Sequence, residues 1–318
     1  MSYRSRDLML SDFYGLESNF PNLISHESIG KSTAGRDIPL FKIGNVAGGR
    51  VMLVGGIHGD ESTGPEIMNK YAHWLLERKE PATCDRILSR NYTLIMPMLN
   101  IDNYRLHRKN LNGVDLNRNF PTGWCQCSAG STDPTHWAYK GPSAGSEKET
   151  QAMVNALQKW RPKFLLDYHQ INGPAFGAPT SFAGVTAQDR AYHKAIATKI
   201  GCMLGGQYLC DNCATSQRGV TPYSYWEVLG VCGPLIDDAY KLGGATAFLL
   251  EGHVNREAAT PYADIDTTYF PRFLPFAIVM SDNATPPPLP PALLIGLGIL
   301  TIAGIGYLIY LATNRKRW

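Results

Sequence analysis

The sequence predicts a single α/β domain whose mostly parallel or mixed sheet is flanked by helices. Two observations support this prediction: short apolar runs that are typical of buried strands, and stretches with helical patterns between some of them. Strands that alternate with helices favour a sheet covered on both faces. The chain has 318 residues, of which 44% are hydrophobic and 18% charged, which suits one large domain and excludes a disordered chain.

Four apolar runs predict the strands of this sheet. They cover residues 51–57, 92–99, 164–168 and 245–250. Runs that are apolar at most successive positions, rather than at alternate ones, suit strands that are buried on both faces. We therefore expect a sheet with helices packed on each side of it.

Three stretches predict helices. Residues 63–78 begin with a capping residue and an early proline, Pro65, and their apolar residues fall on one face of a helix. Residues 147–160 and 189–201 have helical patterns as well. Because helices separate some of the strands, the sheet is expected to be mostly parallel.

Ionisable residues follow the ends of three predicted strands. His58 follows the first run, His169 the third and Glu251 the fourth. Open α/β sheets bind ligands outside the carboxyl ends of their strands. The sequence therefore predicts a site at this edge of the sheet.

A metal site is one interpretation of these residues. His58 and Glu61 lie close together at a strand-to-helix junction, where the chain turns through Gly59. Catalytic zinc commonly takes two histidines and one glutamate and keeps a position for water, and His169 is the natural third ligand. A histidine and a glutamate at this spacing are also common on ordinary surfaces, so these residues alone leave both interpretations open.

Other residues supply the groups that a zinc peptidase needs besides the metal. Such an enzyme needs a carboxylate that takes a proton from water and a cation that stabilises the developing oxyanion. Glu251 could be the base. The stretch 108–121 supplies Arg108, Arg118 and the side-chain amide of Asn117, and arginine's planar fork suits a terminal carboxylate.

Four motifs occur in a characteristic order along the chain. They are GKSTAGRDI at residues 30–38, GGIHGDE at 55–61, RKNLNGVDLNRNFP at 108–121, and the acid Glu251 at a strand end. In these motifs the chain resembles the M14 family of zinc carboxypeptidases, and in HGDE and GVDLNRNFP it is most similar to the regulatory carboxypeptidase branch and its bacterial relatives. The resemblance implies a single-domain zinc-carboxypeptidase-like fold.

The resemblance also implies which residues hold the metal and carry out the chemistry. One zinc ion would be bound by His58, Glu61 and His169. Glu251 would activate the water and shuttle its proton. Arg108 would stabilise the oxyanion together with the zinc.

Substrate binding is implied in the same way. Asn117 and Arg118 would hold the free carboxylate of the substrate. The family has a mobile tyrosine before the general base, and its usual position is Leu229 in this chain. Tyr225 is the candidate for this role if the loop length has changed.

These roles together predict a zinc-dependent metallocarboxypeptidase. It would hydrolyse a C-terminal peptide bond by a zinc-activated water with Glu251 as general base, and its substrate would be a peptide with a free C-terminal carboxylate. Two alternatives stay open. One is a murein γ-D-glutamyl peptidase or another zinc amide hydrolase; the other is an inactive membrane-tethered protein that binds peptides.

The C-terminal part of the chain differs in composition from the rest. Residues 284–291 are rich in proline, which favours an extended spacer. Residues 292–312 contain no charged residue and are long enough to cross a bilayer as a helix. The sequence therefore predicts a catalytic domain over residues 1–283, a proline-rich stalk over 284–291, a transmembrane helix over 292–312 and a basic tail over 313–318.

Charge bears on the partners and on the orientation in the membrane. The formal net charge of +3 is too small to indicate a nucleic-acid partner. A polar N-terminus without a secretory run favours a catalytic domain on the cytoplasmic side, whereas the basic tail favours the opposite orientation. On balance we expect the cytoplasmic side, and nothing in the sequence indicates an oligomeric state.

Overall fold

The computed structural model describes residues 2–125, 130–170, 175–179, 183–203, 210–211, 224–227, 233–252 and 262–284. All of them belong to one unit, which spans Met1–Thr285. The second unit, Pro286–Trp318, contains the predicted transmembrane helix and basic tail and lies outside the described residues. Among the helices that are described, none is both long enough and apolar enough to cross a membrane.

The described strands form one mixed sheet with the order β1-β2-β4-β3-β5-β9-β6-β8-β7. The inner strands β4, β3, β5 and β9 run parallel, whereas β1 pairs antiparallel with β2 and β6 pairs antiparallel with β9. The strands are β1 (Ile24–Lys31), β2 (Asp37–Gly44), β3 (Gly49–Val54), β4 (Asn91–Met96), β5 (Phe164–His169), β6 (Ala175–Ala178), β7 (Cys210–Asp211), β8 (Ser224–Glu227) and β9 (Thr246–Glu251).

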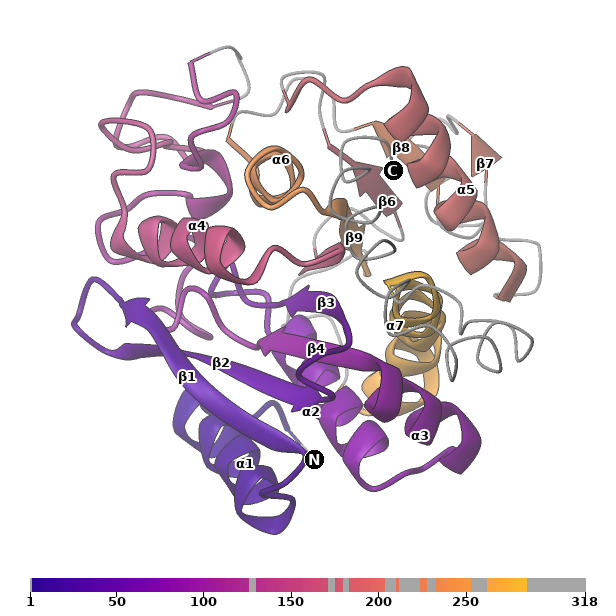
Figure 1. Cartoon of the computed structure of the whole chain (residues 1–318). Coiled ribbons are helices and arrows are strands. Elements are labelled where there is room, and N and C mark those ends of the chain that lie inside the picture. The colour runs from indigo at the N-terminus through magenta and orange to yellow at the C-terminus, as the bar shows by residue number, and fades with distance from the viewer. Residues whose placement is uncertain are drawn as a thin grey trace, which may run out of the picture. The chain divides into compact units, whose positions relative to one another are not determined.

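Helices cover both faces of this sheet. The α-helices are α1 (Arg6–Asn19), α2 (Thr63–Leu76), α3 (Pro81–Arg90), α4 (Lys148–Trp160), α5 (Ala187–Met203), α6 (Leu235–Lys241) and α7 (Phe270–Ala284). A short 3-10 turn, η1 (Leu116–Arg118), follows β4, and a π-helical turn, η5 (Ile265–Tyr269), leads into α7. Figure 1 shows α4 and α6 on one side of β1–β4 and α1, α2 and α3 on the other.

Two apolar clusters fill the space between the sheet and the helices. One contains side chains of α1, α2, α3, α5 and α7, and the other contains side chains of α4 and α6. Successive side chains of β3 alternate between them: Val51 and Leu53 join the first cluster, and Met52 and Val54 join the second. The predicted α/β fold, with a mixed sheet flanked by helices, is therefore confirmed.

The four predicted strands appear as β3, β4, β5 and β9, but two of them end earlier than predicted. β3 ends at Val54 and β4 at Met96, because the chain leaves the sheet at these points. Gly56 has φ 58°, a left-handed conformation that favours glycine. The apolar residues beyond the strands, Ile57 and Leu99, are fully buried in the core. Their apolar character therefore reflects burial in a loop and not strand pairing.

The three predicted helices appear as α2, α4 and α5 with small shifts at their ends. The sequence analysis did not predict α1, α3, α6, α7 or the β1–β2 hairpin. In α1 the side chain of Ser5 caps the first turn by accepting a hydrogen bond from the Leu8 amide at 3.3 Å. The buried residues Met9, Phe13 and Leu16 then face the core from one side of this helix.

Candidate active site

The loop between β3 and α2 carries His58 and Glu61. It packs so closely on the chain around Asn103 that a Cβ on Gly59 would lie 2.2 Å from the Asn103 carbonyl oxygen. The Arg105 amide donates to the Gly59 carbonyl at 2.6 Å. Glycine at this position therefore allows two loops to support each other beside the candidate ligands.

His58, Glu61 and His169 lie together at the carboxyl edge of the sheet, and we call them the metal cluster. One ligand atom from each residue lies within 4.8 Å of the others, and all three residues are buried. His58 Nδ1 is 2.8 Å from Glu61 Oε1, and His169 Nδ1 is 3.1 Å from Glu61 Oε2. The two Nδ1 atoms are themselves 3.1 Å apart. The structure thus brings the three sequence-predicted ligands to one point.

Each imidazole of the metal cluster has a carboxylate at its other nitrogen. Asp115 Oδ1 is 3.1 Å from His58 Nε2, and Asp167 Oδ2 is 2.8 Å from His169 Nε2. A carboxylate accepts a hydrogen bond, so it places the N–H on Nε2 and leaves a lone pair on Nδ1. The two Nδ1 lone pairs then face each other and the carboxylate of Glu61, which is unfavourable unless a cation lies between them. This set of two imidazoles and one carboxylate fits zinc.

The pKa shifts of Glu61 and His169 also favour positive charge within the metal cluster. Burial alone would raise the pKa of Glu61, but the neighbouring His58 and His169 outweigh burial and lower it. Burial alone would lower the pKa of His169, but Asp167 and Glu61 hold it well above its ordinary value. Protons supply this charge when no metal is bound, so metal binding and protonation compete for the cluster.

Arg108 connects the metal cluster to Asp115. Its Nη1 donates to Glu61 Oε1 at 3.2 Å, while Nε and Nη2 donate to Asp115 Oδ2 at 3.1 and 3.0 Å. Burial would lower the pKa of Arg108, but the carboxylates of Asp115 and Glu61 raise it. The sequence-predicted oxyanion residue is therefore a fixed cation directly beside a metal ligand.

Asn117 is held with its amide beside the metal cluster. Its Oδ1 accepts a hydrogen bond from the Leu235 amide at 2.9 Å, at the start of α6. This contact fixes the amide and leaves Nδ2 3.3 Å from His169 Nε2. The turn η1 therefore presents Asn117 beside the metal cluster in a single orientation.

Arg118 is the neighbouring residue of the same turn. Its Nη1 donates to the Asn117 carbonyl at 2.8 Å. No hydrogen-bond partner for the buried Nε is found among the described residues. Burial lowers the pKa of Arg118, and the charge of Arg108 adds to this, against the opposing charge of Asp115. An anion beside Arg118 would therefore be stabilised by a cation whose Nε has no hydrogen-bond partner in the described part of the chain.

Glu251 ends β9 at the same edge of the sheet. It lies opposite His169 in the parallel register of β5 and β9, and it is only 8% exposed. Its charge opposes the lowering of the Arg118 pKa by burial, so the two side chains interact. The sequence-predicted base is thus close to both the metal cluster and the predicted substrate arginine.

Tyr225 lies in β8, where its backbone is opposite Phe176 of β6. The side chain of Tyr225 lies outside the described part of the structure. Its role in substrate binding therefore stays a prediction.

Asp115 and Asp167 are the two functional residues that the sequence analysis missed. Asp167 stands two residues before His169 in β5, so both side chains point to the same face of the strand. An acid inside the apolar run FLLDY was the available signal. Asp115 lies within the motif that contains Asn117 and Arg118, and it had no assigned role there.

Comparisons with known proteins agree with this geometry. A family model described as zinc carboxypeptidase matches residues 9–196. Carboxypeptidase A6 from Homo sapiens is 28% identical over 273 residues, which cover 78% of this chain and 60% of the relative. Carboxypeptidase B from Homo sapiens is 32% identical over 161 residues, which cover 43% of this chain and 37% of the relative. The chain thus spans less than two thirds of the length of either relative.

Solved structures show the same fold. Thrombin activatable fibrinolysis inhibitor superimposes with a TM-score of 0.76 and 20% identity, covering 89% of this chain and 74% of that structure. Carboxypeptidase A from Helicoverpa armigera gives a TM-score of 0.71 and 20% identity, covering 89% and 73%. The chain therefore shares its overall fold with these proteins.

Proposed function

Because the chain belongs to the zinc carboxypeptidase family, we propose that it is a metallocarboxypeptidase that releases the C-terminal residue of a peptide. The family model covers more than half of the chain. The observation that supports the activity best is the convergence of the metal cluster, Arg108, Asn117, Arg118 and Glu251 at one edge of the sheet. These residues supply every type of group that hydrolysis of a terminal peptide bond requires.

The metal cluster holds the cofactor in this proposal. His58 and His169 provide Nδ1 and Glu61 provides its carboxylate, while Asp115 and Asp167 keep the imidazoles in the ligating tautomer. A zinc ion bound there supplies Lewis acidity to the reaction.

Glu251 acts as the general base. Its carboxylate accepts the proton of the attacking water and passes it to the leaving amine. Its place opposite His169 in the register supports this role, because β5 and β9 are parallel and end at the same edge. Arg108 stabilises the negative charge that develops on the scissile carbonyl oxygen, since its guanidinium is already oriented by Glu61 and Asp115.

Asn117 and Arg118 restrict the activity to chain ends. The terminal carboxylate pairs with the Arg118 fork, whose Nε has no partner among the described residues. The amide of Asn117 has a fixed orientation, so it can donate to the same carboxylate. A substrate without this negative charge forms no ion pair with Arg118 and loses the charged hydrogen bonds of the fork, which is costly.

Hydrolysis of one peptide, compared between its free acid and its C-terminal amide, tests this function. We expect the amide to be hydrolysed at least about a hundredfold more slowly, because loss of a buried charged partner costs a few kcal/mol. The measurement is kcat/KM for both forms with one sequence. Equal rates would instead favour an endopeptidase or another zinc amide hydrolase, and a parallel assay on murein fragments identifies a γ-D-glutamyl peptidase.

Glu251→Gln separates metal binding from chemistry. The amide side chain cannot accept the proton, so we expect turnover to fall by at least about a thousandfold while zinc stays bound. Retention of the wild-type kcat would show that another residue is the base.

We also propose that residues 292–312 anchor the protein in a membrane, with the catalytic domain on the cytoplasmic side. The support is the uncharged apolar run and the proline-rich segment before it. In intact cells, external protease should leave the catalytic domain uncut. Its digestion with the membrane unbroken would reverse the orientation.

A further inference from the structure

Trp137 is an exposed indole that lies against both arginines of the candidate active site. The Cζ atom of Arg108 is 5.5 Å from the centroid of the Trp137 ring, and that of Arg118 is 5.9 Å away. Both distances are within the range of cation–π attraction. Trp137 is nevertheless 59% exposed, so much of its apolar surface remains available to a ligand.

The loop that carries Trp137 is held in place by hydrogen bonds. Lys109 Nζ donates to the carbonyl of His136 at 3.1 Å, which ties the loop to the residue next to Arg108. The Ser131 amide donates to the carbonyl of Ala138 at 3.0 Å, and Ala138 is fully buried. The residues on both sides of Trp137 are therefore anchored, and the loop presents the indole to the arginines in a defined place.

The proposed roles of the two arginines determine which part of a substrate can reach this indole. Under the function proposed above, the terminal carboxylate pairs with Arg118, and the scissile carbonyl, which belongs to the penultimate residue, lies at Arg108. Trp137 is adjacent to both arginines, so the penultimate residue is the part of the peptide beside its exposed ring.

We propose that Trp137 contacts the side chain of the penultimate residue and selects an apolar or aromatic residue there. This inference rests on the proposed carboxypeptidase function and adds a preference on the other side of the scissile bond. A planar ring with a large exposed surface gains most from burial against an aromatic or apolar partner. A basic side chain is disfavoured, because the guanidinium groups of Arg108 and Arg118 already lie against the ring and repel it.

Two peptides that differ only in the penultimate residue, Phe or Gly, test this proposal with the full-length zinc-loaded chain. We expect the wild type to favour the Phe peptide by about tenfold in kcat/KM. Trp137→Ala should reduce the preference to less than about twofold, mainly through a higher KM for the Phe peptide, because the contact is equal in ground and transition states. Trp137→Phe retains an aromatic ring and should keep most of the preference.

Leu111→Ala is the matched control, since Leu111 is 51% exposed and also close to Arg108 in the chain. It should leave the preference unchanged. Calorimetry of the same two peptides on Glu251→Gln, with and without Trp137→Ala, measures the contact without turnover and should show the same difference. An unchanged Phe preference in Trp137→Ala, with normal cleavage, would overturn the role of Trp137. A wild type that cleaves neither peptide would instead overturn the carboxypeptidase function, and the role of Trp137 with it.

Discussion

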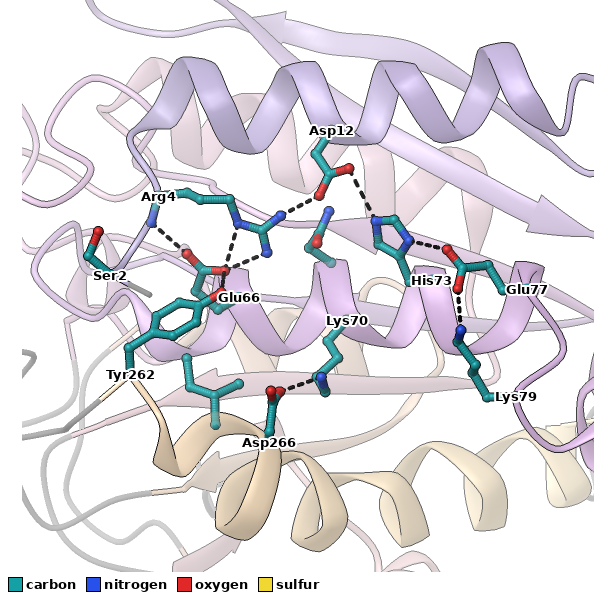
Figure 2. Close-up of a pocket in the computed structure, with 12 residues that line it drawn as sticks. Ser2, Arg4, Asp12, Glu66, Lys70, His73, Glu77, Lys79, Tyr262 and Asp266 are labelled. Carbon is teal, nitrogen blue, oxygen red and sulfur yellow. Dashed lines mark hydrogen bonds and ion pairs between the residues drawn. The ribbon is translucent and has the colours of Figure 1, made fainter.

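Two clusters of charged side chains adjoin helix α2. Two members of the metal cluster, His58 and Glu61, lie in the loop before the helix, and the third, His169, ends β5. The second cluster, which we call the outer cluster, lines a groove beside the helix together with residues from the N-terminal segment, α1 and η5 (Figure 2). Its charged members are Arg4, Asp12, Glu66, Lys70, His73, Glu77, Lys79 and Asp266.

In the outer cluster every carboxylate faces an N–H donor. Figure 2 shows Arg4 between Asp12 and Glu66, and Arg4 Nε donates to Glu66 Oε2 at 2.9 Å. Both nitrogens of His73 face acids: Nε2 is 3.1 Å from Asp12 and Nδ1 is 2.7 Å from Glu77. The hydrogen bond with Asp12, helped by Glu77 and opposed by burial, raises the pKa of His73. A proton on His73 therefore completes this cluster.

The metal cluster differs in the direction of its lone pairs. Asp115 and Asp167 occupy the Nε2 side of each imidazole, so the Nδ1 atoms of His58 and His169 face each other at 3.1 Å. A proton on one Nδ1 satisfies only part of this arrangement, whereas a zinc ion satisfies both imidazoles and Glu61 at once. The comparison shows that a metal site is recognised by where the lone pairs point, since both clusters contain histidines and carboxylates.

Removing one histidine from each cluster tests this comparison most strongly. His169→Ala should lower the zinc content from about one ion per chain to less than about a tenth, because a three-residue site loses a ligand. His73→Ala should keep the full zinc content. Elemental analysis of both purified variants gives the answer. Retention of zinc by His169→Ala, or its loss from His73→Ala, would be incompatible with the assignment of the metal cluster.

Neutralising one acid in each cluster should have a smaller effect. Asp115→Asn weakens the hold on the Nε2 proton of His58, so zinc affinity should fall by about ten- to a hundredfold. Asp12→Asn is the matched control and should leave zinc affinity unchanged. A competition titration with a chelator measures both affinities. If Asp115→Asn binds zinc as tightly as the wild type, the carboxylate does not set the tautomer.

The pH dependence of stability should show the smallest effect, in the outer cluster. The pKa of His73 is raised above its ordinary 6.5 in the folded protein, so its contribution is present below 6.5 and is lost as pH rises through the raised value. The pKa of Asp12 is lowered from 3.8, so its contribution is lost only as pH falls through that lowered value.

Urea unfolding of the wild type and His73→Gln measures how the contribution of His73 to stability changes over this pH range. The wild type should be more stable by up to about 1 kcal/mol at about pH 5.5, and the difference should shrink at about pH 8.5. A difference that grows as pH rises would contradict the imidazolium assignment.

The sequence predicted the metal cluster because its two histidines stand at the ends of apolar runs and Glu61 follows three residues after one of them. His58 follows β3 and His169 ends β5, and parallel strands bring their carboxyl ends to one edge. Asp115 was not predicted, since its partner His58 is 57 residues away in the chain and no local pattern indicates the contact. Asp167, two residues before His169 on the same face of β5, was by contrast an available signal. The site was thus predictable where local sequence sets the position, and not where a contact between side chains does.

The same limit applies to the fold. The parallel strands were predicted from composition, whereas the β1–β2 hairpin was not, because β1 (ISHESIGK) is mostly polar and β2 (DIPLFKIG) does not alternate between apolar and polar residues. The outer cluster joins Arg4 to Tyr262 through Glu66, a contact between segments far apart in the chain. The place of Trp137 likewise depends on the hydrogen bond from Lys109 to His136, which no local pattern indicates.

The central claim is that His58, Glu61 and His169 hold a zinc ion through their inward-facing lone pairs. An anomalous difference map from crystals of the zinc-loaded protein, measured at the X-ray absorption edge of zinc, tests it most directly. The lone-pair arrangement predicts one peak at about 2.1 Å from Nδ1 of both His58 and His169, with the carboxylate of Glu61 as the third ligand. A zinc ion coordinated by Nε2 of either histidine would contradict this arrangement. So would a zinc ion bound elsewhere, with no peak between these three residues.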